Sequence, residues 1–366
     1  MSDVSVLSGP AASRRFHGVQ AIRGLAAIAV VLYHLNAWVL PHRLHLPGLW
    51  SGFDMGYAGV EVFFVLSGFL MARVHGRDIG RPDRLGPFVA KRAVRILPFF
   101  WVVLAGEILL DLLATGQVPS ARSILSSALL WPAFDRQIIV VAWSLSFEVM
   151  FYAGFAVAIL SRPVGLALAG AWCAACLATL PSDWAGVEAV WLSPYNLLFA
   201  MGVLAALPRP GPRAALVCVM VGGVLFLATG LSAAVWQVDW PKSLRTLSFG
   251  IGAAALILGV TAREIAGAHP GRATLSLVGD ASYAIYLLHM PALALMIRLV
   301  PAGHLPLPLT FGLLFCGALL AGIAGHLLIE RPVLAWCRGR LAAGGHGVGS
   351  GPGSVSRHHA RMKVKV

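Results

Sequence analysis

Residues 22–38 read IRGLAAIAVVLYHLNAW, an apolar run that nevertheless carries Arg23 and His34. A charged side chain inside a membrane span costs about 2.5–3.5 kcal/mol on insertion, so such residues usually face a cavity or a partner. The two residues lie eleven positions apart, which in a helix is about 20° past three full turns and about 16 Å along the axis. We therefore expect both side chains on one face of one helix, with Arg23 and His34 toward opposite ends.

The whole chain has the composition of a membrane protein. Apolar residues make up 58% of its 366 residues, charged residues make up 12%, and the mean hydropathy is +0.80. Soluble domains carry about 25% charged residues. We predict an all-α polytopic helix bundle, because spans of about 20 apolar residues must satisfy their backbone hydrogen bonds internally. About ten candidate transmembrane spans follow, at roughly residues 20–40, 56–74, 94–115, 138–160, 164–180, 189–207, 214–231, 245–261, 274–299 and 309–330.

The Lys and Arg residues predict the orientation of these spans. An even number of spans puts both termini on one side, and that side collects 22 of the 28 Lys and Arg residues. Because cytoplasmic loops are enriched in Lys and Arg, both termini are predicted to be cytoplasmic. The net charge of +13 is thus mainly a topology signal, and nucleic acid is not an expected partner.

One membrane domain is expected, over residues 20–332. A cytoplasmic segment, residues 1–19, precedes it. Residues 333–366 are expected to form a cytoplasmic, disordered tail, because their Gly- and Ser-rich basic composition cannot bury a core.

The second span, GYAGVEVFFVLSGFLMARV at residues 56–74, carries two polar side chains of interest. Glu61 is expected near its outer end, at the depth of His34, and Ser67 about two turns further in. Close helix packing by small residues is an equally good explanation of Ser67 and Gly68.

The fourth span contains VAWSLSFEVMFY, residues 141–152, with Glu148 flanked by Trp143 and Tyr152. A carboxylate near the middle of a span requires a partner, which makes Glu148 a candidate site residue.

The third span begins KRAVRILPFFW, residues 91–101. The charge bias alone would explain Lys91, Arg92 and Arg95. With Arg23, however, Arg92 and Arg95 could bind the phosphates of an anionic cytoplasmic substrate, since guanidinium groups pair well with phosphate oxygens.

The ninth span contains GDASYAIYLLHMP, residues 279–291, with Tyr286 and His289. His289 is either a second site residue or a core histidine with satisfied hydrogen bonds. The tenth span ends in IERP, where Glu330 and Arg331 are expected to form an interfacial ion pair. No metal site is predicted.

Together these motifs resemble the acyltransferase 3 family of integral membrane acyltransferases, which O-acylate bacterial cell-surface and exported polysaccharides. The matching pieces run from residue 22 to residue 332: IRGLAAIAVVLYHL, GVEVFFVLSGFLM, KRAVRILP, WSLSFEVMFY, SYAIYLLH and ERP. Glu61 departs from the Asp that the family often has, and the fused SGNH hydrolase-like domain of some members is not expected here.

The resemblance implies transfer from a cytoplasmic donor, acetyl-CoA or another acyl-CoA, to a polysaccharide or lipid-linked glycan at the bacterial inner membrane. It implies that His34 is the essential histidine and Arg23 its paired arginine. Ser67 matches the serine of the family's FFxxSG motif, and Glu148 matches its WSLSxE motif. Arg92 and Arg95 match its basic cluster.

We expect His34 to act as general base or transient acyl carrier, with Glu61 or Glu148 orienting its ring. Ser67 is a second candidate carrier. Trp143, Tyr152, Tyr286 and His289 are candidate substrate-binding residues. Membrane lipid and a separate extracytoplasmic partner are further expected partners. The alternative is a transporter or flippase with a buried substrate or proton pathway, although no internal repeat of the kind common in transporters is visible.

Overall fold

Helices account for the regular structure of the chain over residues 16–131, 137–180, 188–267, 273–299 and 305–345, the residues that the computed structural model describes. The elements are α1 (His17–Tyr33), η1 (His34–Val39), α2 (Leu40–Arg43), η2 (Ser51–Ala58), α3 (Gly59–His75), η3 (Gly76–Asp78), η4 (Pro82–Arg84), α4 (Leu85–Thr115), α5 (Ala121–Ala128), η5 (Val140–Ala142), α6 (Trp143–Leu160), α7 (Arg162–Ala178), α8 (Glu188–Trp191), α9 (Tyr195–Ala205), α10 (Pro212–Ala234), α11 (Lys242–Ile265), α12 (Ala273–Asp280), α13 (Ser282–Leu299), α14 (Leu307–Gly325), η6 (His326–Glu330) and α15 (Arg331–Gly345). The predicted all-α class is confirmed.

Seven helical segments in this part of the chain are long and apolar enough to cross a membrane. They are His17–Arg43, Ser51–Asp78, Pro82–Thr115, Val140–Leu160, Pro212–Ala234, Lys242–Ile265 and Leu307–Arg340. The other three predicted spans coincide with the shorter apolar helices α7, α9 and α13. The chain is a multi-pass membrane protein; the total of ten spans and the side of the termini stay predictions.

Two predicted spans are interrupted. The span at 189–207 is divided into α8 and α9, with Pro194 as the N-cap of α9, where its missing amide proton does no harm. The span at 274–299 is divided into α12 and α13 on either side of Ala281.

The predicted tail is helical in its first part. Residues 333–345 belong to α15, which continues the helical segment of α14 and η6. Residues 346–366, like residues 1–15, lie outside the described residues.

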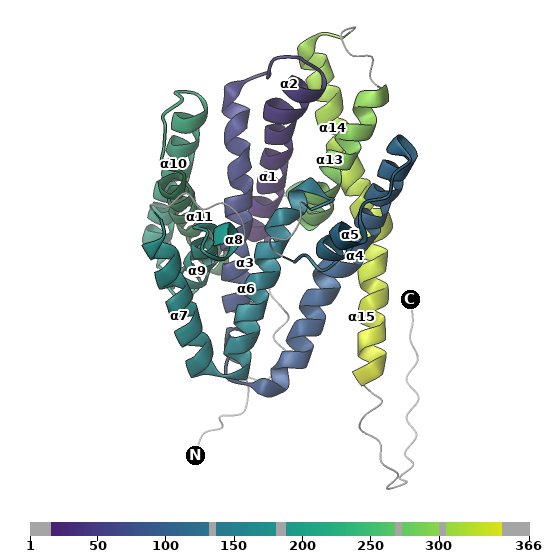
Figure 1. Cartoon of the computed structure of the whole chain (residues 1–366). Coiled ribbons are helices and arrows are strands. Elements are labelled where there is room, and N and C mark those ends of the chain that lie inside the picture. The colour runs from purple at the N-terminus through teal and green to yellow at the C-terminus, as the bar shows by residue number, and fades with distance from the viewer. Residues whose placement is uncertain (1–15, 132–136, 181–187, 268–272, 300–304, 346–366) are drawn as a thin grey trace, which may run out of the picture.

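Helix α1 is the centre of the bundle. It packs against α3, α11, α12, α13 and α14, and in Figure 1 α1 and α3 lie between a group formed by α7 and α9–α11 and another formed by α4 and α13–α15. Residues of α1 can therefore meet side chains from both groups.

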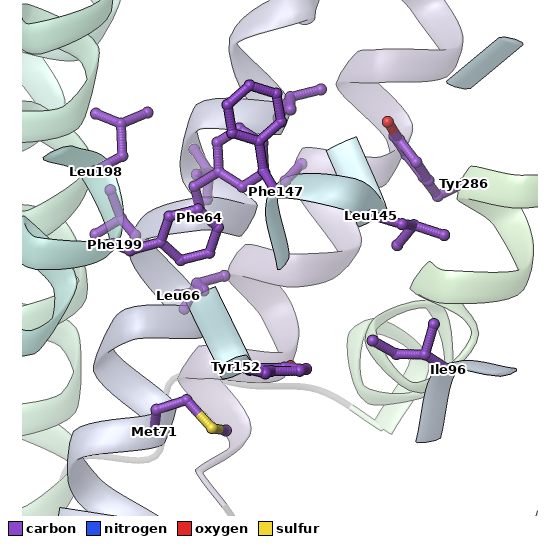
Figure 2. Packing of buried hydrophobic residues seen from close by; sticks show 14 of the residues in the cluster. Phe64, Leu66, Met71, Ile96, Leu145, Phe147, Tyr152, Leu198, Phe199 and Tyr286 are labelled. Carbon is purple, nitrogen blue, oxygen red and sulfur yellow. The ribbon is translucent and has the colours of Figure 1, made fainter. Parts of the chain in front are cut away.

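Helix α3 is held against α6 and α9 by aromatic rings. The Phe64 ring centroid is 5.7 Å from that of Phe147 and 4.8 Å from that of Phe199, and Figure 2 shows the three rings together. Beside them, a methyl group at Gly68 would overlap the Phe199 carbonyl. Helix packing thus explains Gly68, and leaves Ser67 to be explained separately.

Candidate functional site

Two cavities, each of about 590 Å³, lie along α1. The arginine cavity is lined by polar residues of six helices: Arg23, Ser67, Lys91, Arg92, Arg95, Ser144, Glu148, Tyr152, Ser282, Tyr283 and Arg338. The histidine cavity is lined by Tyr33, His34, Asp54, Tyr57, Glu61, Trp143, Tyr195, Gln237, Lys242, Arg245 and Thr246. Val60 and Tyr286 line both cavities, so these two side chains form the wall where the cavities meet.

Arg95 of the arginine cavity is fixed by a buried ion network. Its Nη1 donates to Glu330 Oε1 at 2.6 Å, and the other Glu330 oxygen lies 2.7 Å from His326 Nδ1. Arg95 also lies over the Tyr283 ring, 5.3 Å from its centroid. The prediction that Glu330 pairs with Arg331 at the membrane boundary is therefore wrong: Glu330 is fully buried and pairs with Arg95.

Glu148 connects the remaining polar groups of this cavity. It accepts hydrogen bonds from Ser67 Oγ, at 3.3 Å, and from the Tyr152 hydroxyl. Arg92 lies over the Tyr152 ring, with its guanidinium carbon 5.8 Å from the centroid. Glu148 therefore organises the arginine cavity, and its hydrogen bonds do not support the expectation that it orients His34.

His34 lies at the junction of α1 and the π-helical turn η1, residues His34–Val39. Its Nδ1 is 2.9 Å from the Val30 carbonyl oxygen and 3.2 Å from Nε2 of His289. The two imidazole centroids are 4.9 Å apart. A second π-helical turn, η6, ends at Glu330. Single π turns within α-helices occur frequently at functional sites. Here η1 contributes His34 to the histidine cavity, and η6 contributes Glu330, the partner of Arg95.

The wall of the histidine cavity is built from aromatic and charged side chains. Arg245 lies over the Tyr57 ring, 5.1 Å from its centroid, and Glu61 is 2% exposed. Asp54 accepts a hydrogen bond of 2.7 Å from Asn36, whose Oδ1 accepts from the amides of Leu49 and Trp50. Asn36 thus ties the loop after α2 to this cavity.

The structure separates the residues singled out in the sequence into two groups. Arg23, Ser67, Arg92, Arg95, Glu148 and Tyr152 line the arginine cavity; His34, Glu61 and Trp143 line the histidine cavity. Tyr286 lines both. His289 is 0% exposed and lines neither cavity, but its ring contacts the ring of His34.

Sequence reasoning missed Asn36, Asp54, Lys242, Arg245 and Arg338. A signal for Lys242 and Arg245 was available, since both are among the few basic residues assigned to the outer side, against the charge bias. Arg338 was assigned to the tail, and its helical position was not foreseen.

A family model described as an acyltransferase domain matches residues 16–329. The chain belongs to the acyltransferase 3 family. It is accordingly a membrane acyltransferase, which uses an acyl donor. In the described part of the chain, no group of three or more His, Cys, Asp or Glu residues is placed to hold a metal ion.

Three relatives of this acyltransferase 3 member are informative. The exopolysaccharide production protein ExoZ of Rhizobium meliloti (strain 1021) is 32% identical over 319 residues, which cover 80% of this chain and 94% of ExoZ. The putative membrane-bound transacylase BcsY of Komagataeibacter xylinus is 27% identical over 369 residues, which cover 87% of this chain and 82% of BcsY. The putative peptidoglycan O-acetyltransferase YrhL of Bacillus subtilis (strain 168) is 27% identical over 162 residues, which cover 38% of this chain and 23% of YrhL. No solved structure matches the chain.

Proposed function

We propose that this acyltransferase moves an acyl group, with acetyl the expected one, from cytoplasmic acyl-CoA to a hydroxyl of a cell-surface or exported polysaccharide or lipid-linked glycan. The observation that carries the proposal is the pair of cavities along α1, which meet at Val60 and Tyr286. One cavity holds the arginines and the other holds His34, so donor and acceptor can approach one point from opposite sides.

The arginine cavity suits the donor. Lys91, Arg92 and Arg338 line it together with Arg23, and guanidinium groups bind phosphate oxygens through charge-assisted hydrogen bonds. The distance of about 16 Å along α1 from Arg23 to His34 is close to the length of an extended pantetheine arm. Acyl-CoA phosphates held at Arg23 would therefore let the thioester reach the wall at Val60.

The histidine cavity suits a sugar. Tyr33, Tyr57, Trp143 and Tyr195 provide aromatic surfaces, and Asp54 and Glu61 provide hydrogen-bond acceptors for hydroxyl groups. Two cationic and two acidic side chains line it. Because their formal charges cancel, the cavity suits a neutral acceptor. The names of ExoZ and YrhL, which refer to exopolysaccharide and to peptidoglycan, support a glycan acceptor.

In the proposed reaction, His34 takes the proton of the acceptor hydroxyl as its oxygen attacks the thioester carbonyl. The new C–O bond forms and the C–S bond breaks. The CoA thiolate that leaves receives the proton from His34, which returns the imidazole to its neutral form. The products are an O-acyl ester and free CoA.

A covalent relay is the variant to exclude. Ser67 donates its hydrogen bond to Glu148, so a carboxylate base is placed to take its proton if Ser67 receives the acyl group first. A Ser67→Ala enzyme that retains transfer would exclude the relay through Ser67 and leave direct attack or a relay through His34.

The test uses the full chain purified into lipid nanodiscs, with acyl-labelled acyl-CoA and a glycan acceptor. We expect labelled acceptor and free CoA in equal amounts. A transporter or flippase would leave the thioester intact, and that result would overturn the proposed function.

A further inference from the structure

We infer that His289 is a positioning residue that fixes the tautomer of His34, so that Nε2 of His34 is unprotonated and available to the acceptor hydroxyl. The inference rests on the proposed function for its consequence in catalysis. The tautomer itself follows from the hydrogen bonds around the two rings.

The first constraint comes from His289. Its Nδ1 lies 2.7 Å from the Tyr286 carbonyl oxygen and 3.2 Å from that of Ile285. Carbonyl oxygens only accept hydrogen bonds, so this nitrogen carries the proton. In a neutral imidazole, Nε2 of His289 is then an acceptor.

The second constraint comes from His34, and its contact with Val30 is independent of the first. Its Nδ1 lies 2.9 Å from the Val30 carbonyl oxygen, and 3.2 Å from Nε2 of His289. Both neighbours accept, so Nδ1 of His34 carries the proton and shares it between them. The two constraints agree, because the contact between the rings holds one proton and that proton belongs to His34.

The consequence concerns the opposite side of the His34 ring. A neutral His34 with its proton on Nδ1 has its lone pair on Nε2, and His34 lines the histidine cavity. A general base needs such a lone pair within reach of the acceptor proton. In the other tautomer, Nε2 would carry a proton and could not receive another.

Burial makes His289 suited to this role. It is 0% exposed and belongs to α13, which packs against α1. Its ring therefore touches His34 without lining either cavity, and its effect on the reaction is expected to pass through His34.

The test compares His289→Gln with His289→Asn. A Gln side chain can place an amide oxygen near the position of Nε2 and accept the His34 proton. An Asn side chain is one methylene shorter and can serve only the backbone carbonyls. Both variants have the same functional group, so a difference between them reports contact with His34.

The direct readout is nitrogen NMR of the full-length protein, labelled with 15N-histidine and placed in lipid bilayers. The His34 signals are identified by their absence in His34→Ala. We expect a protonated Nδ1 and an unprotonated Nε2 in the wild type and in His289→Gln. We expect a mixture of the two tautomers in His289→Asn, because the acceptor that remains for Nδ1, the Val30 carbonyl oxygen, also accepts from the backbone amide of His34. An unchanged His34 tautomer in His289→Asn would overturn the inference.

The kinetic readout separates positioning from a structural role. For His289→Asn we expect kcat to fall about 10²-fold, the lower range of what a general base contributes, with the KM for acyl-CoA unchanged. His289→Gln should stay near wild type. Equal loss in both variants, or a matching rise in the KM for acyl-CoA, would contradict the inference. Failure of the proposed function would be seen instead as a wild-type protein that transfers no acyl group while its His34 tautomer is as stated.

Discussion

The arginine cavity and the histidine cavity have the same volume, about 590 Å³, but opposite chemistry. The first gathers cations, and one of them, Arg95, is fixed by the buried carboxylate of Glu330. The second has a balanced set of charges, four aromatic side chains besides Tyr286, and His34. A two-sided membrane site is typical of a transporter, yet a transporter presents similar chemistry to one substrate from both sides. The difference between these cavities suits two substrates that meet.

The largest effect is expected from His34→Ala. We predict that kcat falls about 10³-fold, because the acceptor hydroxyl loses its general base, while binding of acyl-CoA is unchanged. Transfer in nanodiscs and donor binding by titration are the measurements. His42→Ala is the matched control, since the exposed ring of His42 contacts the carbonyl and the ring of Trp38 and lines neither the arginine cavity nor the histidine cavity. An equal fall in kcat in the two variants would contradict the role of His34 as the general base.

The next largest effect is expected on stability, at the ion pair that fixes Arg95 in the arginine cavity. Glu330→Gln removes the charge that pairs with Arg95 and is expected to lower the free energy of unfolding by about 3 kcal/mol, since the partly buried charge of Arg95 loses its carboxylate partner. Asp83→Asn is the control, because its ion pair with Arg84 is exposed and contributes at most about 1 kcal/mol. Denaturation in detergent measures both, and equal effects would mean that the buried network does not hold the arginine cavity.

Removal of a charge from one cavity should raise the KM for the substrate that enters that cavity and leave the KM for the other substrate unchanged. Arg92→Gln is predicted to raise the KM for acyl-CoA roughly 10- to 100-fold, the equivalent of one charged hydrogen bond of about 1.5–3 kcal/mol. Arg245→Gln, in the histidine cavity, should change only the KM for the acceptor. Steady-state kinetics with each substrate varied in turn measures this. A rise in donor KM for Arg245→Gln would show that the cavities do not divide the substrates.

The smallest expected effect is the change in kcat when the pH is lowered by one unit. At saturating substrates, kcat should fall about tenfold for each pH unit below the point at which His34 takes up a proton, because the protonated imidazole has no lone pair to accept another. Activity is then lost as the pH falls and recovered as it rises. The measurement is a pH profile of kcat, and a flat profile on the acid side would count against His34 as the base.

The helices and half of the site geometry could be predicted from the sequence because both depend on local spacing. Runs of about 20 apolar residues indicate spans, and eleven helical steps put Arg23 and His34 on one face. The seven long helices bear out the all-helical membrane fold. The shared face favours one common cavity for Arg23 and His34, whereas the structure places them in two cavities that meet at Val60 and Tyr286.

The partners of these residues could not be predicted, because they come from distant parts of the chain. His289 is 255 positions from His34, and Glu330 is 235 positions from Arg95. Both contacts depend on how α13, α14 and η6 pack against α1 and α4. The local spacing of residues along the sequence does not indicate this packing. The π-helical turn at His34 was also unforeseen, since its sequence HLNAWV is compatible with an ordinary α-helix.

The most direct test of the central claim, that donor and acceptor enter by opposite cavities, is a sidedness measurement. Inside-out membrane vesicles that contain the protein enclose a soluble glycan acceptor, and membrane-impermeant, acyl-labelled acyl-CoA is added outside. We predict labelled acceptor in the lumen, and none when donor and acceptor are both outside. Transfer between substrates confined to the same side would contradict the account.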